Sequence, residues 1–202
     1  MAYLKDREQL LEMLRGRSVR FGAFVLASGQ HSDVYIDAKL TTCCARAMPL
    51  VGKALLDKME ERGWFPQAVG GLTMGADPIA MAVARESLER DHPIDCFVVR
   101  KEPKKHGLRK FIEGLDETTG IRVVVIDDVC TTGESTATAI KRARDAGLNV
   151  IGALCLVDRE MGARELLEGE LRCAFDSIFT LDELTHAGRE PVAPFATSRT
   201  GS

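Results

Sequence analysis

The chain has 202 residues, 45% of them hydrophobic and 28% charged, with a formal net charge of -3 at pH 7. That length allows one domain with a substantial core, and we expect a single domain over 1–202. The weak negative charge gives no reason to expect general binding to nucleic acid, so any phosphate site should be confined to a small part of the surface. We therefore expect small-molecule substrates rather than nucleic acid or a membrane as partners.

The N-terminal residues carry charge at once, at Lys5, Asp6 and Arg7, and lack the apolar core of a signal peptide. The longest apolar run, 150–157, is too short to span a bilayer. We therefore expect a cytoplasmic protein.

Six cysteines occur without a C-x-x-C pair and without histidine at zinc-finger spacing, at positions 43, 44, 96, 130, 155 and 173. We expect most of them to be reduced core residues, because free cysteine is among the most buried residue types.

The first quarter of the chain predicts a helix, a hairpin and a second helix. Leucines recur at helical spacing among charges from residue 4 to about 15, and Gly16 is a plausible end. Two short apolar pieces around a polar turn, over 21–37, indicate a hairpin. Helical spacing returns over 45–62 and stops at Gly63. We expect about 1–40 to form a small N-terminal unit of helix and hairpin.

From residue 67 onward, strand-like and helix-like segments alternate. Strands are predicted at 67–71, 94–99, 123–126, 150–157 and 173–180, and helices at about 79–88, 136–146, 164–171 and 181–186. We expect the last residues, from about 190, to be a flexible tail. The alternation predicts an α/β fold with a mainly parallel central sheet flanked by helices, with the strand-end loops on one rim.

The most informative stretch is 123–136, where a buried strand runs into two acids and a polar turn. Thr131, Thr132, Gly133, Glu134 and Ser135 offer backbone N–H groups and hydroxyls in front of a helix, which suits a phosphate monoester. The two acids, Asp127 and Asp128, would repel that phosphate and suit sugar hydroxyls, a cation or developing positive charge. Taken alone, they are also typical of an ordinary turn. Neither a Walker loop nor G-x-G-x-x-G occurs.

A second polar segment follows the strand at 94–99. Six of the eleven residues in 100–110 are Lys or Arg. The segment is either an exposed basic turn or part of an anion site, because isolated charge runs are usually solvated.

The stretch 123–135 resembles the phosphoribosyl pyrophosphate motif of type I phosphoribosyltransferases. Within that superfamily, 100–107 resembles the mobile catalytic loop of orotate phosphoribosyltransferases, and 156–160 resembles a further segment of theirs. Residues 24–29, with Ser32 and Tyr35, resemble the hairpin that covers their substrate. The resemblance spans about 20–160 and implies transfer of a phosphoribosyl group to orotate, in pyrimidine biosynthesis.

The resemblance also implies roles for individual residues. Lys104 matches the catalytic lysine of the family, and Asp127 and Asp128 match the acids that bind the ribose hydroxyls and steady the cationic sugar. The remaining matches to the donor site are Arg100, Lys101 and His106 on pyrophosphate, and Val129, Cys130, Thr131, Thr132, Gly133, Glu134 and Ser135 around the 5-phosphate. Thr131 and Arg159 match the orotate contacts, and a planar guanidinium suits a carboxylate.

Magnesium is the expected cofactor, held mainly by substrate oxygens and water, with no direct protein ligand expected. Family members are homodimers whose basic loop reaches the neighbouring site, so we expect a homodimer in which Lys101 can act across the interface.

Two positions depart from the family pattern, because Ala27 and Gly75 stand where many members have lysine. Lys105 and Lys53 are candidates to compensate. Two other functions stay open at this point: a phosphoribosyltransferase for another base, and a non-catalytic regulator that senses the donor on the same fold. Retention of both acids and the basic loop argues against the regulator.

Overall fold

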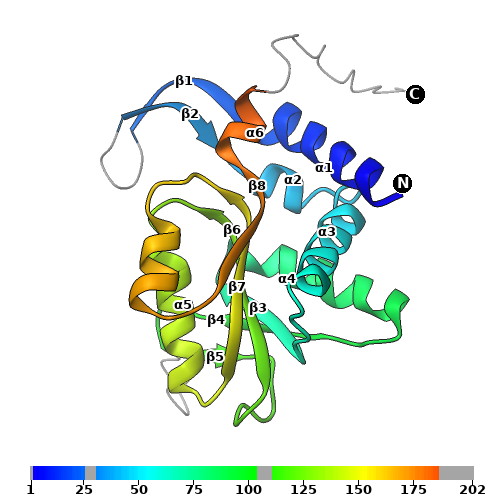
Figure 1. The fold of residues 1–202 in the computed structure, drawn as a ribbon, viewed down its shortest axis with the longest axis vertical. Helices are drawn as coiled ribbons and strands as arrows, with labels where there is room; N and C mark the ends of the chain where they lie inside the picture. Colours follow the sequence, from blue (N-terminus) through cyan, green and yellow to red (C-terminus); the bar gives the residue numbers. More distant parts are fainter. Residues whose placement is uncertain (1, 26–30, 104–110, 187–202) are drawn as a thin grey trace, which may run out of the picture.

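The computed structural model describes residues 2–25, 31–103 and 111–186. These residues form a central sheet with helices on both faces and a separate two-stranded hairpin beside one end of it (Figure 1). The helices are α1 (Ala2–Ser18), α2 (Lys39–Thr42), α3 (Met48–Glu61), α4 (Ala76–Ser87), the short η1 (Leu88–Arg90), α5 (Glu134–Asp145), the π-helical η2 (Glu165–Glu170) and α6 (Leu181–His186). The strands are β1 (Val19–Val25), β2 (His31–Ile36), β3 (Ala68–Leu72), β4 (Asp95–Val99), β5 (Ile112–Glu113), β6 (Arg122–Cys130), β7 (Asn149–Asp158) and β8 (Phe175–Thr180).

The six-stranded sheet has the order β5-β4-β3-β6-β7-β8. Every neighbouring pair is parallel except the edge pair β4 and β5. The predicted mainly parallel α/β fold is therefore confirmed. Because the parallel strands share a direction, the loops after β3, β4, β6 and β7 meet at one edge of the sheet.

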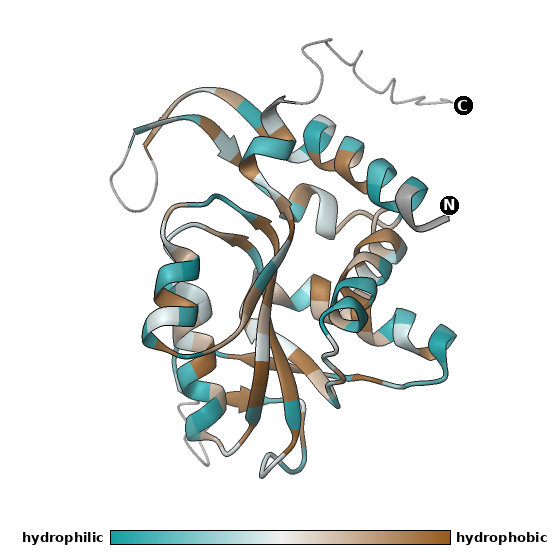
Figure 2. Cartoon of the chain, in the orientation of Figure 1, coloured by the Kyte–Doolittle hydropathy of each residue, from teal (hydrophilic) through white to brown (hydrophobic). Residues whose placement is uncertain are grey.

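Two apolar cores lie on opposite faces of the sheet. Val124 and Ile126 of β6 pack with residues of α1, α3 and α4, whereas Val123 and Val125 pack with residues of α5 and η2. Both faces are covered, which explains the unbroken hydrophobic run of this strand. Figure 2 shows the same pattern, with hydrophobic residues along the strands and hydrophilic ones on the outer sides of helices.

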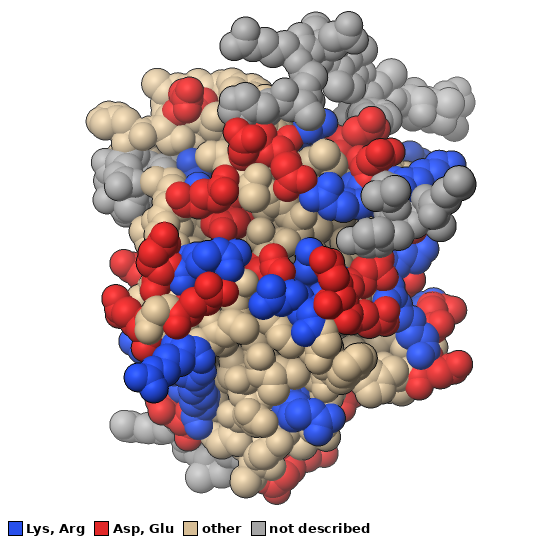
Figure 3. Space-filling model, viewed as in Figure 1, with Lys and Arg blue, Asp and Glu red and all other residues tan. Residues whose placement is uncertain are grey.

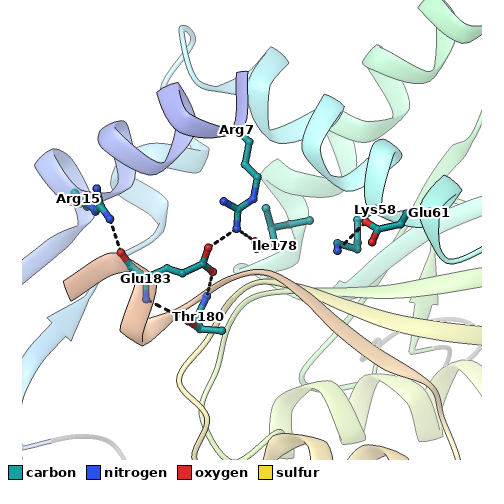
Figure 4. A network of polar contacts seen from close by, with 7 residues as sticks. All are labelled: Arg7, Arg15, Lys58, Glu61, Ile178, Thr180 and Glu183. Carbon is teal, nitrogen blue, oxygen red and sulfur yellow. Dashed lines mark hydrogen bonds and ion pairs between the residues drawn. The ribbon is translucent and has the colours of Figure 1, made fainter. Parts of the chain in front are cut away.

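The two ends of the described chain are tied together beside the sheet (Figure 4). Glu183 accepts hydrogen bonds from Arg7 of α1 and, at 3.0 Å, from the backbone N–H of Thr180. Its own N–H donates to the Thr180 hydroxyl, so the two residues form a capping box at the start of α6. Arg7 also donates to the carbonyl of Ile178 at 3.0 Å and lies over the Phe179 ring. This network holds α1 against β8 and α6.

Several predicted boundaries were wrong. Helix α1 continues past Gly16 to Ser18. The helix predicted at 164–171 is present, as a π-helix over Glu165–Glu170. The short elements α2 and β5 were not predicted. Most important, β6 does not end before the acids: it continues to Cys130, because β7 pairs with it from Arg122 to Cys130. Tertiary strand pairing overrides the turn preference of aspartate here.

The cysteine prediction holds for half of the set. All six are free, but only Cys130, Cys155 and Cys173 are buried, whereas Cys43 is exposed. Basic and acidic side chains are interspersed over the face of the molecule in Figure 3. Among the described residues, none of the helices combines the length and apolar character needed to cross a membrane.

Candidate active site

A cavity of about 510 Å³ opens at the carboxyl edge of the sheet. It lies between the ends of β6 and β7 and the hairpin strand β2. Its lining residues are Tyr35, Ile36, Asp127, Val129, Cys130, Thr131, Thr132, Gly133, Glu134, Ser135 and Arg159. The structure thus brings the predicted phosphate loop, one acid and the predicted orotate contacts around one space.

The loop of the cavity is shaped by Gly133. Its φ of +82° lies in the left-handed region, and a side chain there would stand 3.1 Å from the Cα of Ala163. Helix α5 begins at the next residue, Glu134. A left-handed glycine directly before a helix leaves free N–H groups at the positive end of the helix dipole, which is an arrangement suited to a phosphate.

Asp127 is buried, and both of its carboxylate oxygens are hydrogen-bonded. The hydroxyl of Thr136 donates to Oδ2 at 2.8 Å, and the backbone N–H of Asp128 donates to Oδ1 at 3.0 Å. Burial and the neighbouring charge of Asp128 raise the pKa of Asp127 to about 7, against the effect of these two hydrogen bonds. This carboxyl group can therefore exchange a proton near neutral pH.

Asp128 does not line the cavity and has different partners. The ammonium of Lys39, on α2, donates to its Oδ2 at 3.1 Å, and the N–H of Val129 donates to Oδ1 at 2.9 Å. A side chain at Gly75 would meet Asp128 Oδ1 at 2.5 Å. Glycine at position 75 is therefore what allows the turn after β3 to approach this acid.

Arg159 is the cation of the cavity, and its side chain is nearly enclosed. It is 7% exposed and donates through Nη2 to the Ser32 hydroxyl at 3.0 Å and to the Val34 carbonyl at 3.3 Å. Its buried Nε has no hydrogen-bond partner, and within the described ranges no carboxylate forms an ion pair with it. Burial lowers its pKa. A buried guanidinium without a counter-ion favours an anionic ligand.

A second hollow, of about 520 Å³, lies beside the end of β4 and is lined by Thr73, Met74, Val98, Arg100, Lys101, Glu102 and Glu113. Helix α5 holds the backbone of Arg100, because Arg142 donates to the carbonyl of Arg100 and lies 4.2 Å over the ring of Phe111. The cationic side chains of the hollow therefore start from a fixed backbone.

The predicted site residues fall into three groups. Arg159 and the residues from Val129 to Ser135 share the first cavity with Asp127, whereas Arg100 and Lys101 line the second hollow. Asp128 lines neither space, but it follows Asp127 in the sequence and lies close to Gly75, in the turn after β3. Lys104, His106 and the departure at Ala27 lie outside the described residues.

Three contacts were missed from the sequence: Lys39 on Asp128, Thr136 on Asp127 and Arg142 on the backbone at the end of β4. Only Thr136 carried a local signal, since it follows the phosphate loop directly. The other two pairs join residues 89 and 42 positions apart, and nothing in a single sequence marks them.

Comparison with known proteins gives a consistent result. Residues 46–182 match the family described as "Phosphoribosyl transferase domain". The orotate phosphoribosyltransferase of Aquifex aeolicus (strain VF5) is 46% identical over 182 residues, which is 89% of this chain and 97% of that protein.

Two solved structures of Mycobacterium tuberculosis H37Rv orotate phosphoribosyltransferase are also similar. The complex with Fe(III) dicitrate superposes with a TM-score of 0.78 at 40% identity, covering 89% of this chain and 99% of the other. The complex with 5-phospho-α-D-ribosyl 1-diphosphate (PRPP) has a TM-score of 0.74 at 37% identity, covering 89% and 98%.

Proposed function

We propose roles for the residues of this site from the premise that the chain belongs to the phosphoribosyltransferase family and, within it, to the orotate phosphoribosyltransferases. Its reaction is the transfer of the 5-phosphoribosyl group from PRPP to orotate, which gives orotidine 5-phosphate and pyrophosphate in pyrimidine biosynthesis. The residue roles below are our proposal.

The observation that supports orotate as the base is that the buried guanidinium of Arg159 has no carboxylate partner among the described residues. Orotate carries a carboxylate on its pyrimidine ring, and a planar guanidinium binds a carboxylate through two parallel hydrogen bonds. The buried Nε of Arg159 has no partner among the described residues and is one of the donors available for this contact. We propose that Thr131, which lines the same cavity, contacts the ring.

The donor occupies the phosphate loop and the acids. The loop from Thr131 to Ser135 binds the 5-phosphate through its N–H groups and hydroxyls at the start of α5, and Val129 and Cys130 line the cavity directly before it. The two acids, Asp127 and Asp128, accept the ribose hydroxyls. As the bond from C1 to pyrophosphate breaks, positive charge develops on the sugar, and nearby carboxylates stabilise it.

The leaving pyrophosphate requires positive charge, which the end of β4 supplies. Arg100 and Lys101 line the second hollow beside Asp128, and Lys104 and His106 follow them in the sequence. We assign these four residues to the pyrophosphate and Lys104 to catalysis. Their cationic groups neutralise charge on the leaving group.

Magnesium is the proposed cofactor, and the donor set fits it. Among the described residues, no group of three or more His, Cys, Asp or Glu side chains is placed to hold a metal ion. Mg²⁺ retains water ligands and binds substrate phosphates, so we propose that donor oxygens and water hold it, with no direct protein ligand. When bound, the ion neutralises phosphate charge.

We also propose a homodimer and a cytoplasmic location. Support for the dimer comes from exposed large apolar side chains: Met74, which lines the second hollow, is 71% exposed, and Met81 of α4 and Leu40 of α2 are 55% and 44% exposed. A partner that covers Met74 would lie beside Lys101, which lines the same hollow. Sedimentation equilibrium tests the dimer; a monomer at micromolar concentration would exclude it.

The experiment that tests the function mixes the protein with magnesium, PRPP and orotate and follows the loss of orotate absorbance. We expect time-dependent loss that requires all three reagents. Parallel reactions contain uracil, adenine or hypoxanthine, and a binding titration uses labelled RNA or DNA. Turnover of one of these bases without turnover of orotate would refute the assignment of the base, and nucleic-acid binding without turnover of any base would refute the enzyme.

A further inference from the structure

The ammonium of Lys39 contacts Asp128, an acid that lies close to residues of both hollows. Asp127 lines the first cavity, and Thr73 and Met74, directly before Gly75, line the second. Asp128 follows Asp127 in the sequence and lies close to Gly75 in space. Lys39 donates to Asp128 Oδ2 at 3.1 Å, so its positive charge lies within reach of a ligand that contacts this acid.

Lys39 retains capacity for a further contact. A lysine ammonium has three donors. One reaches Asp128, and Asp37 Oδ1 lies at 3.6 Å, which is an ion pair without a normal hydrogen bond. In the described ranges the ammonium makes no other hydrogen bond. Its side chain is 48% exposed, so an anion in the site can reach it.

Glycine at position 75 supplies no positive charge. The turn after β3 approaches Asp128 so closely that even a Cβ at Gly75 would stand 2.5 Å from Oδ1. Lys39 approaches the same carboxylate from α2, on the side of the hairpin. Because Lys39 and the turn at Gly75 approach the same carboxylate, Lys39 supplies the positive charge that a cation in the turn would supply. Lys53, the other candidate in this part of the chain, pairs instead with Asp6 of α1.

A purely structural role explains the contact less well. An ion pair in which the lysine is half exposed typically contributes little to the stability of a fold. Partial burial lowers the pKa of Lys39, but attraction to Asp128 and the hydrogen bond to it outweigh this effect and leave the pKa above its ordinary value. The ammonium is therefore positively charged at neutral pH, where the donor is anionic.

We propose that Lys39 is a donor-binding residue: it holds Asp128 in place and binds the polyanionic phosphoribosyl donor through its remaining N–H groups. This inference rests on the proposed function, because it assumes that PRPP is the substrate. It adds one residue to the site and assigns to α2 the positive charge that the turn at Gly75 lacks.

The test compares K39M with wild-type protein in steady-state kinetics and in calorimetric titration with PRPP and magnesium. We expect the KM and Kd for PRPP to rise roughly ten- to a hundredfold, as for loss of a hydrogen bond to a charged group. The KM for orotate should stay within about twofold, since Lys39 does not line the orotate cavity. K39R should recover most of the donor affinity.

Lys53→Met is the matched control, because it removes the same charge from α3 and leaves the site intact. An unchanged KM and Kd for PRPP in K39M, or an equal rise in the KM for orotate, would overturn the inference. If K39M does not fold, K39Q is judged by the same criteria. If wild-type protein does not consume orotate, the proposed function fails, and the calorimetric comparison still decides whether Lys39 binds the donor.

Discussion

The ends of strands β6 and β4 both contribute to the site, but they are built differently. At the end of β6 the acids lie within the strand ladder, and Asp127 is 6% exposed with both oxygens hydrogen-bonded. At the end of β4, Arg100 and Lys101 extend into an open hollow, and the side chain of Arg100 is 41% exposed.

The difference separates two tasks of the enzyme. The β6 end offers fixed backbone groups and buried acids, which suit a ribose phosphate bound in one geometry. The β4 end offers charges on long side chains, which can adjust to a leaving group that moves away. Arg142 connects the two, since it lies on the helix that begins at the phosphate loop and anchors the carbonyl of Arg100. We therefore expect damage at β4 to lower kcat and damage at β6 to raise the KM for PRPP.

The largest effect should come from the β4 side. Lys104→Ala should lower kcat by about 10²- to 10³-fold, because it removes a cation that acts on the leaving group mainly in the transition state. The KM for PRPP should change much less. Steady-state kinetics measure both parameters, and Lys141→Ala, an exposed residue of α5, is the control for loss of charge. Near-normal kcat in Lys104→Ala would show that the β4 end does not carry the catalytic charge.

The next effect concerns the burial of Asp127. Because the native pKa is raised to about 7, the folded protein holds a proton between about pH 4 and 7 that the unfolded chain releases. Stability from this group is therefore present at low pH and is lost as pH rises through that window. Asp127→Asn does not titrate, so its free energy of unfolding relative to wild type should increase by about 2 kcal/mol from pH 5 to pH 8.

Urea unfolding at pH 5, 6, 7 and 8 measures this difference directly. Asp116→Asn, at an exposed position in the turn before β6, is the control and should show no such trend. A difference that stays constant with pH would mean that Asp127 is not held in the partly protonated state that its burial implies.

The smallest effect should come from the phosphate loop. Gly133→Ala places a side chain at a φ of +82° and 3.1 Å from the Cα of Ala163, at a cost of about 1–2 kcal/mol. Because this strain displaces the N–H groups that bind the 5-phosphate, a loss of the same size in donor binding should raise the KM for PRPP by about five- to thirtyfold, with a smaller change in kcat. Gly120→Ala is the matched control, because its φ of +74° is similar but nothing lies within 4 Å. If both substitutions raise the KM for PRPP equally, the effect does not come from the phosphate loop.

The sequence predicts the fold well where the signal is local or periodic. The unbroken hydrophobic run from Val123 predicts a buried strand, and the structure covers both faces of that strand. Helix α6 begins at Leu181, where it was predicted. The extension of β6 through Asp127 to Cys130 could not be predicted, because it depends on pairing with β7. Long-range partners decide strand ends more than the propensity of the residues does.

The site follows the same rule. The loop from Thr131 to Ser135 was predicted as a unit because its residues are adjacent in sequence. The loop and Arg159 line one cavity because β6 and β7 run parallel and end at the same edge of the sheet. The contact of Lys39 with Asp128 depends on how α2 packs against the sheet. A pattern of residue types contains no information on that packing.

We propose that Arg159, which is buried and has no carboxylate partner among the described residues, selects a base with a carboxylate. The most direct test is the ratio of kcat/KM for orotate to that for uracil, which has the same ring without the carboxylate, in wild type and in Arg159→Gln. We predict a wild-type preference for orotate of about a hundredfold or more, which falls at least about tenfold in the variant through loss of orotate turnover. An unchanged preference in Arg159→Gln would contradict the account.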